Sequence, residues 1–592
     1  MKNKSIIILI AAIFGISLPS CVDMDLVSQS TMSSDQLAAD PAGLEYATIG
    51  AYRWFRQNRT GMAGGSSSRD VYARNWFQMN EFRGDNVFIA GVTSDPFMKS
   101  YEYTDADTEA TCRYMWYASY SIMNILNTNI RIGVEGESSK IDHLLGENYF
   151  LRALIYLNLC DLFARPYSQG TNNPAVVLRT EEPLTGDITR ATIGEVYEQI
   201  EKDLKKAIQL MGNGRRSDNA SHAWKGSAQG LLSRLYLYME RNQEVVNIVN
   251  EMLEGKTSAD VLDSDLATYF TRTQTSHETL WCIGYLPNES PGTSSVASMY
   301  LTDPISGTGW GEIYPSDPIY ELFNRYADAD IRWKDFHLFQ PIPAPGVTFN
   351  GEDVQWMASW PVPNPTSWYH GLQYRYLAED ASGKYILFSN NSGLNNPVND
   401  DYFANTGTKI YIQEEIVNTY TKYFFTYNGT KVNVTVTPAT NNRMSYRKIF
   451  NSKFSYQDGN AMLCSYPMIR WGEVILNRAE AYAKLDNPSA ALADVNAIRS
   501  RAGLSGSQLM TAGNMGERGY ANTLDVVLDE RRLELAYEGF RWKDLFRNNK
   551  PMDRRYAGTH PWEVIQPTDL RIPHQISGDE TLINPGVLAN PR

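Results

Sequence analysis

The chain has 592 residues, of which 43% are hydrophobic and 12% aromatic, ample for one large core or for several domains. A formal net charge of −13 argues against a nucleic-acid partner, because no basic segment offsets the acidic residues. Beyond the first twenty residues no apolar run is long enough to cross a bilayer, so we expect a body without membrane-spanning segments.

The first twenty residues have the pattern of a bacterial export signal. Two lysines precede an apolar run, 6–18, that is too short for a comfortable membrane span. The run leads into the letters LPSC, which resemble a lipobox and make Cys21 the expected lipidation site. An ordinary signal peptide with an incidental cysteine is the alternative. Residues 21–37, rich in serine, are expected to form a flexible lipidated tether.

Helical periodicity dominates two parts of the chain, about 38–286 and about 460–592, which are expected to form the scaffold. Thr192 and Glu195 have the spacing of a capping box, which predicts that a helix begins there. Short connections between the periodic segments predict antiparallel helix pairs.

The clearest pair lies near the C-terminus, with one helix expected over 468–485 and a second over 488–501. Trp471 early in the first helix, alanines at the crossing and Pro488 in the first turn of the second are typical of a tetratricopeptide unit of about 34 residues. Because such units cannot bury their apolar faces alone, they must stack on one another.

The segment from about 287 to 459 has a different texture. Gly, Pro, Asn, Ser and aromatic residues crowd together there, and two short runs, 409–413 and 431–436, have β-strand character. A long irregular segment is usually disordered or functional, and this one is too rich in Trp and Tyr for disorder. We therefore expect an ordered, loop-rich cap on the helical scaffold.

Four cysteines besides Cys21 are far apart and form no CxxC pair. An oxidising compartment permits disulfides, but their pairing cannot be read from spacing. Cys112 and Cys160 fall in helical patterns, which favours buried free thiols.

Five segments have the character of family motifs. In chain order they are 146–156 (GENYFLRALIY), 189–204, 470–482 (RWGEVILNRAEAY), 530–547 (ERRLELAYEGFRWKDLFR) and the closing stretch 572–585. They are similar to motifs of the SusD/RagB family of nutrient-binding lipoproteins. The resemblance spans nearly the whole chain and includes the lipoprotein start.

The resemblance implies a mainly α-helical fold of degenerate tetratricopeptide-like pairs. It implies a single SusD-like domain over 38–592, with 287–459 as a variable, ligand-binding region containing short strands. It also implies lipid anchoring on the outer face of a Gram-negative outer membrane and a SusC-like TonB-dependent transporter as partner. Glycan would be the captured nutrient, with peptide as the alternative within the family. Asp23 and Asp25 resemble the acidic surface-export signal of such lipoproteins.

Aromatic residues of the cap are the first candidates for ligand contact, because an indole covers the C–H face of a sugar at modest entropic cost. The alternative is that these rings pack the cap onto the helices. The candidates are Trp310, Trp356, Trp360, Trp368 and Tyr369.

Polar candidates come from the turn 81–86, which resembles a family segment near the binding face. Asp85 and Asn86 lie in this turn, and Tyr101 and Tyr103 lie in the loop that follows. Their side chains could donate or accept hydrogen bonds to ligand hydroxyls.

Two other classes of protein compete with a binding protein. A surface glycoside hydrolase would need two carboxylates that flank the scissile bond. On the charged helix near Glu530, however, Asp529 can pair with Arg532 and Arg531 with Glu534, which favours structural ion pairs. Trp471 and Trp542 are likewise expected to pack between helices.

No HExxH, P-loop or GxSxG motif occurs, and the seven histidines show no metal-ligand spacing. No catalytic residue, metal or cofactor is therefore expected. The third class, a purely partner-binding helical repeat protein, is compatible with the fold.

Overall fold

The computed structural model describes most of the chain after the expected tether. The described residues are 34–40, 42–57, 71–91, 93–180, 188–326, 328–340, 348–349, 352–363, 366–387, 408–444 and 446–592. Cys21 and the acidic residues next to it lie outside them. Within these ranges no helix is both long and apolar enough to cross a membrane.

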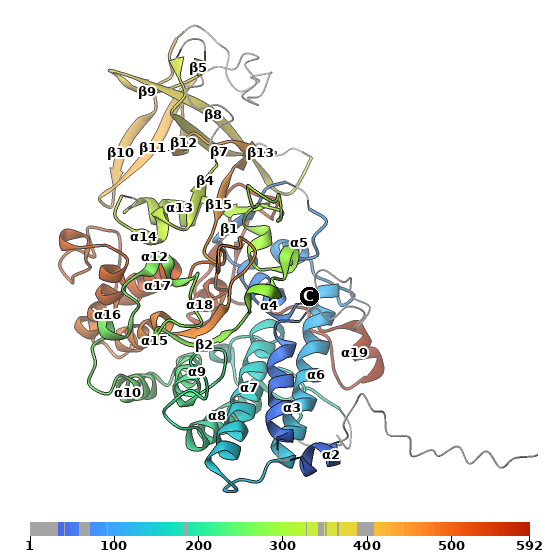
Figure 1. Ribbon diagram of the computed structural model, residues 1–592. Coiled ribbons are helices and arrows are strands. Elements are labelled where there is room, and N and C mark those ends of the chain that lie inside the picture. Colours follow the sequence, from blue (N-terminus) through green and yellow to red (C-terminus); the bar gives the residue numbers. More distant parts are fainter. Residues whose placement is uncertain are drawn as a thin grey trace, which may run out of the picture.

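Helices form the lower body of the molecule in Figure 1. They are α2 (Ser34–Ala39), α3 (Gly43–Trp54), α4 (Tyr72–Glu81), α5 (Phe97–Glu102), α6 (Ala110–Ile132), α7 (Ser139–Phe163), α8 (Ile193–Leu210), α9 (Lys225–Tyr238), α10 (Asn242–Leu253), α11 (Ser258–Val261), α12 (Leu266–Tyr269), α13 (Asp317–Asn324), α14 (Ile331–Lys334), α15 (Trp471–Lys484), α16 (Pro488–Arg501), α17 (Thr523–Glu534), α18 (Arg541–Arg547) and α19 (Gly578–Ile583). Consecutive helices from α6 to α10 pack on one another, and α10 packs on α15, so the two helical parts of the sequence form one body.

The local signals for helix boundaries are confirmed. The Glu195 amide donates to Thr192 Oγ1 (3.2 Å) and the Thr192 amide donates to Glu195 Oε2 (2.8 Å), which is a complete capping box at the start of α8. Pro488 opens α16 as expected, and Gly503, with a φ of +92°, follows its end.

The expected start of the preceding helix is wrong by three residues. Residues 466–470 form strand β16 (Tyr466–Arg470), which pairs with β2 (Thr279–Ile283), and α15 begins only at Trp471. Short-range periodicity cannot reveal this pairing, because the partner strand is almost 190 residues away in the sequence.

The cap contains a six-stranded antiparallel sheet with the order β10-β11-β12-β7-β8-β9, seen at the top of Figure 1. Its strands are β7 (Trp356–Pro363), β8 (His370–Asp380), β9 (Gly383–Ile386), β10 (Gln413–Val417), β11 (Tyr420–Tyr427) and β12 (Thr430–Pro438). The β-character expected for 431–436 is confirmed by β12. Several strands are longer than the short ones expected.

The sheet closes into a small barrel. The Ile386 amide donates to the Ile410 carbonyl (2.9 Å), and the Ile412 amide donates to the Lys384 carbonyl (2.8 Å). Residues 410–412 therefore extend the edge at β9 and continue directly into β10, the other edge. This pairing covers the edge of β9, which removes one exposed edge strand of an open sheet.

Shorter strands lie outside the barrel. They are β1 (Val87–Ile89), β3 (Ile313–Pro315), β4 (His337–Phe339), β5 (Thr348–Phe349), β6 (Glu352–Asp353), β13 (Asn442–Arg443), β14 (Tyr446–Arg447), β15 (Ile449–Asn451), β17 (Met552–Asp553) and β18 (Val564–Ile565). Strands β5 and β6 pair as a hairpin at the top of Figure 1, and most of the others lie between the barrel and the helical body. Strand β1 pairs with β3, and β15 pairs with β4. All four cysteines of the described body are buried free thiols, as expected for Cys112 and Cys160.

Candidate functional site

Four loops meet around the ribbon formed by β1 and β3. Loop 301–312 leads into β3, and the Ala90 amide at the end of β1 donates to the Glu312 carbonyl (2.8 Å). Loop 556–562 runs along β1, where the Tyr556 hydroxyl donates to the Val87 carbonyl (3.1 Å). The remaining two loops, 366–370 and 440–447, approach from the barrel.

The short hairpin of β13 and β14 links these loops. Its Arg443 forms an ion pair with Glu312 (2.5 Å), which ties the hairpin to loop 301–312. Strand β14 packs against β8, which follows loop 366–370. At the hairpin tip, Met444 lies against Gly91, whose φ of +83° and lack of a Cβ allow this close approach.

Exposed aromatic rings distinguish this region from the rest of the cap. Trp310 is 53% exposed and Trp368 is 50% exposed, and Met444 between their loops is 61% exposed. Trp368 meets Tyr369 edge to face, with ring centroids 6.3 Å apart. On loop 556–562, Trp562 is stacked on His370, with centroids 3.8 Å apart. We refer to Trp310, Trp368, Tyr369, Met444 and Trp562 together as the aromatic face.

Large exposed rings are the surface property that a glycan-binding site needs, because they present apolar area without any side chain having to be displaced. Loop 301–312 also holds Trp310 firmly, since the Trp310 amide donates to the Ser298 carbonyl (2.6 Å) and both neighbouring glycines have positive φ. The ring is therefore presented on an ordered backbone.

Three of the five predicted aromatic residues, Trp310, Trp368 and Tyr369, lie on the aromatic face, and their contact with ligand stays a prediction. The structure contradicts a binding role for Trp360. Its ring is 2% exposed and meets Phe425 edge to face in the barrel core, with centroids 5.2 Å apart. Trp356 lies at the rim of the same core, donates to Glu379 (3.2 Å) and is covered by the Lys384 ammonium.

The four predicted polar residues are all buried, so their side chains are not available to a ligand. Asp85 binds Arg541 (2.9 Å), and Asn86 accepts from Arg532 (2.8 Å). The Tyr101 hydroxyl bonds to His560, and the Tyr103 hydroxyl donates to the Arg83 carbonyl (2.7 Å). The contacts of Asp85, Asn86 and Tyr101 fasten the turn 81–86 and α5 to the C-terminal part of the chain. Tyr101 lies in α5 and Tyr103 at its end, not in the expected loop, and Tyr103 bonds back to the turn.

Sequence reasoning missed His370, Met444 and Trp562. Trp562 follows Pro561 in a loop without helical periodicity, the same signal as at Trp310, but it lies outside 287–459. The stacking of Trp562 on His370 joins positions far apart in the chain, so only the tertiary structure shows it.

Comparison with known proteins shows which family the chain belongs to. Residues 272–579 match the model of the SusD family, which covers more than half of the sequence. The chain belongs to the SusD family. Residues 64–237 of this SusD-family chain also match a model described as "Starch-binding associating with outer membrane".

Two curated relatives are SusD-like proteins of Formosa agariphila. SusD-like protein P2 is 23% identical over 90% of this chain and 88% of its own length. SusD-like protein P38 is 36% identical over a shorter stretch, which covers 18% of this chain and 20% of that protein.

Solved structures share the fold. A SusD superfamily protein from Bacteroides thetaiotaomicron aligns with a TM-score of 0.66 and 20% identity, over 95% of this chain and 100% of that chain. A SusD-like carbohydrate binding protein from Bacteroides vulgatus aligns with a TM-score of 0.61 and 16% identity, over 92% and 96% of the two chains. At this identity the likeness shows the fold, and it confirms the helical SusD-like architecture with a strand-containing region.

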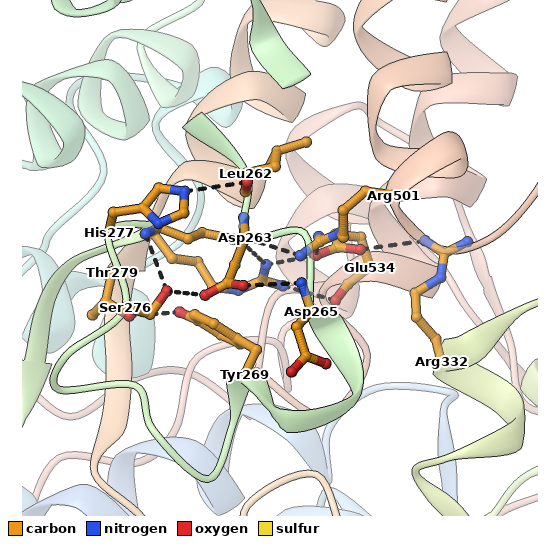
Figure 2. A network of polar contacts seen from close by, with 12 residues as sticks. Leu262, Asp263, Asp265, Tyr269, Ser276, His277, Thr279, Arg332, Arg501 and Glu534 are labelled. Atoms are coloured by element: carbon orange, nitrogen blue, oxygen red, sulfur yellow. Dashed lines mark hydrogen bonds and ion pairs between the residues drawn. The ribbon is translucent and has the colours of Figure 1, made fainter. Parts of the chain in front are cut away.

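Acidic side chains of the SusD-like helical body are neutralised by arginines. Figure 2 shows Glu534 between Arg501 and Arg332, with Oε1 of Glu534 2.5 Å from Arg501 and Oε2 3.4 Å from Arg332. Burial by itself raises the pKa of Glu534, but Arg501, Arg470 and Arg332 together hold it well below its ordinary value. A carboxylate with so low a pKa cannot serve as the general acid of a glycosidase.

Structural ion pairs on α17 are confirmed, although their partners differ from those expected. Arg531 binds Asp544 (2.9 Å) on α18, and Arg532 contacts Asp85 (3.2 Å) in the turn after α4. The partners lie on other elements because α17 is buried on several sides, so its charges meet neighbouring elements rather than one another. Trp471 and Trp542 are buried, as expected.

One cluster of potential metal-ligating groups occurs among the described residues, formed by Asp105, Cys112 and His574. Arg83 and Arg592 both form ion pairs with Asp105, the latter at 2.7 Å. Burial, helped by Arg83, lowers the pKa of His574 to about 4. Two guanidinium groups beside a single carboxylate oppose a bound cation, so the cluster has a structural role.

Proposed function

We propose that this SusD-family chain captures glycan at the outer surface of the outer membrane and delivers it to a SusC-like TonB-dependent transporter. The observation that carries the proposal is the aromatic face, where exposed Trp310 and Trp368 project from ordered loops of a SusD-like fold. The family description, starch binding in association with the outer membrane, is consistent with both parts of it.

The structure favours binding without catalysis. Beside the aromatic face, Glu312 is engaged by Arg443 (2.5 Å). Carboxyls with raised pKa values are buried elsewhere: burial raises the pKa of Glu81 and that of Asp203, and each is held by internal hydrogen bonds. Neither can reach a ligand on the aromatic face.

Anchoring completes the proposal. Lipidation of Cys21, followed by a serine-rich tether, would hold an acidic body at the membrane without inserting it into the bilayer. The tether would let the body cover a transporter while the anchor stays in the lipid.

One experiment on the full chain in mild detergent distinguishes a binding protein from an enzyme. The protein is applied to an array of neutral and acidic polysaccharides, and the bound glycan is then analysed for shorter products. We expect retention of at least one glycan with no product release. Turnover at catalytic rates would make the chain a glycosidase, and retention of peptides alone would favour the peptide-binding alternative.

Partnership with a transporter is tested by gentle purification from outer membranes. We expect the chain to co-purify with a large β-barrel protein of the TonB-dependent class. Recovery of the chain only by itself, under conditions that keep other lipoprotein complexes intact, would count against delivery to such a partner.

A further inference from the structure

Lys448 is an unusual cation next to the aromatic face. It is half-buried, and its Nζ lies 4.9 Å from the centre of the Phe450 ring. Within the described residues it forms no ion pair with any carboxylate. Burial lowers the pKa of Lys448, and the nearby Arg443 lowers it further. The ammonium group is thus partly desolvated and repelled by Arg443, and no carboxylate of the described residues pairs with it.

Other lysines of the described chain that lie over aromatic rings are also paired with carboxylates. Five others lie over aromatic rings, and each also contacts a carboxylate: Lys384, Lys409, Lys431, Lys453 and Lys543. Lys431 is the closest match, since its Nζ lies 4.2 Å from the centre of the Phe424 ring and 2.7 Å from Glu415. Lys448 lies over the Phe450 ring but forms no ion pair with a carboxylate of the described residues.

Phe450 connects Lys448 to Trp310. The backbone of Gly311, next to Trp310, lies against the Phe450 ring so closely that a Cβ there would come within 2.7 Å of it. Lys448 covers the same ring. Arg443, which repels Lys448, is bound to Glu312, two residues beyond Trp310. The neighbourhood of Trp310 therefore carries two cations, Arg443 and Lys448, and Glu312 neutralises only the first.

We infer that the ligand is an anionic glycan, and that Lys448 binds a carboxylate or sulfate of the sugar next to the one that stacks on Trp310. This inference rests on the proposed glycan-binding function and names the class of glycan. A charged group on the ligand would supply the anion that the fold gives to every other ring-bound lysine named above. Charge-assisted bonds to a partly desolvated ammonium are stronger than those in open water.

The same polysaccharide array tests the inference with a defined set of probes. It includes polygalacturonate and its methyl ester, a sulfated galactan and its desulfated form, other neutral glycans, and polyglutamate. We expect the tightest ligand to be a glycan bearing a carboxylate or sulfate, and its neutralised form to bind about tenfold more weakly. Added salt should weaken binding of the acidic form only.

Variants assign the effect to one residue. Lys448→Met should remove the preference for the acidic form, Lys448→Arg should keep it, and the matched control Lys431→Met should leave it unchanged. Circular dichroism checks that each variant keeps its helical content. If the Met variant fails to fold, Lys448→Gln, which also removes the charge, takes its place.

The outcomes separate the two proposals. If the tightest ligand is neutral, or if Lys448→Met keeps a full preference for the acidic form, the inference about Lys448 is overturned while glycan binding stands. If polyglutamate is retained and no glycan is, the proposed glycan function fails together with the inference. The carboxylate and sulfate pairs of probes show which anion the site prefers.

Discussion

Truncating the two exposed tryptophans of the aromatic face tests the binding model most directly. Trp310→Ala and Trp368→Ala remove platforms that project from loops, and neither ring belongs to a core. We therefore expect the variants to keep their helical content and their stability while losing affinity for the glycan.

The size of the loss follows from the exposed area. A tryptophan buries roughly 150–250 Å² when fully covered, and Trp310 is 53% exposed, so about 100 Å² is available to a ligand. A sugar on one face covers about half of that, and ~50 Å² at ~25 cal/mol per Å² is worth ~1.3 kcal/mol, close to tenfold in Kd. Trp368 is 50% exposed and should contribute a similar factor.

Affinity gel electrophoresis and calorimetry on the array's best ligand measure the effect. The double variant should bind about 100-fold more weakly if the two platforms act independently. Tyr46→Ala is the matched control, because Tyr46 is equally exposed (59%) but lies on α3, at the opposite end of the molecule from the barrel (Figure 1). Binding by the double variant within twofold of the unmodified chain would refute the assignment of the aromatic face.

Three further predictions concern stability and anchoring. Trp360→Ala should lower the free energy of unfolding by ~3–5 kcal/mol in denaturant titrations, and a loss below ~1 kcal/mol would contradict its place in the barrel core. Burial lowers the pKa of His337 to about 3 and, with Arg83, that of His574 to about 4. Both stay neutral in the fold, so stability should fall from pH ~6.5 toward 4, by up to ~1.4 kcal/mol per pH unit for each, and His574→Gln should flatten that slope. Cys21→Ala should release the chain from the membrane fraction, and continued membrane attachment would point to a different anchor.

Much of the fold could be predicted from local sequence signals. The capping box at Thr192, the proline at the start of α16 and the helical stripes act within a few residues of one another, so their physics is present in the sequence itself. The order of motifs along the chain likewise indicated the family, because each motif is a contiguous segment.

Strand pairing was harder to anticipate. Trp356, Ala358, Trp360 and Val362 alternate with residues of the opposite face, which is a strand pattern, yet proline and glycine nearby made the segment resemble a loop. Whether such rings face outward or inward depends on closure of the sheet by residues 410–412, about fifty positions away.

The sequence by itself determined the class of this protein: an acidic, helix-dominated chain with the motifs of the SusD family. The tertiary structure decided which of its aromatic and charged residues are available to a ligand. It buried Trp360 in a closed barrel, engaged Asp85 and Asn86 with arginines, and left Trp310 exposed. It also placed Lys448 over Phe450 with no ion pair among the described residues. Composition and periodicity report what a residue is, whereas exposure and pairing depend on neighbours that the fold brings from distant parts of the chain.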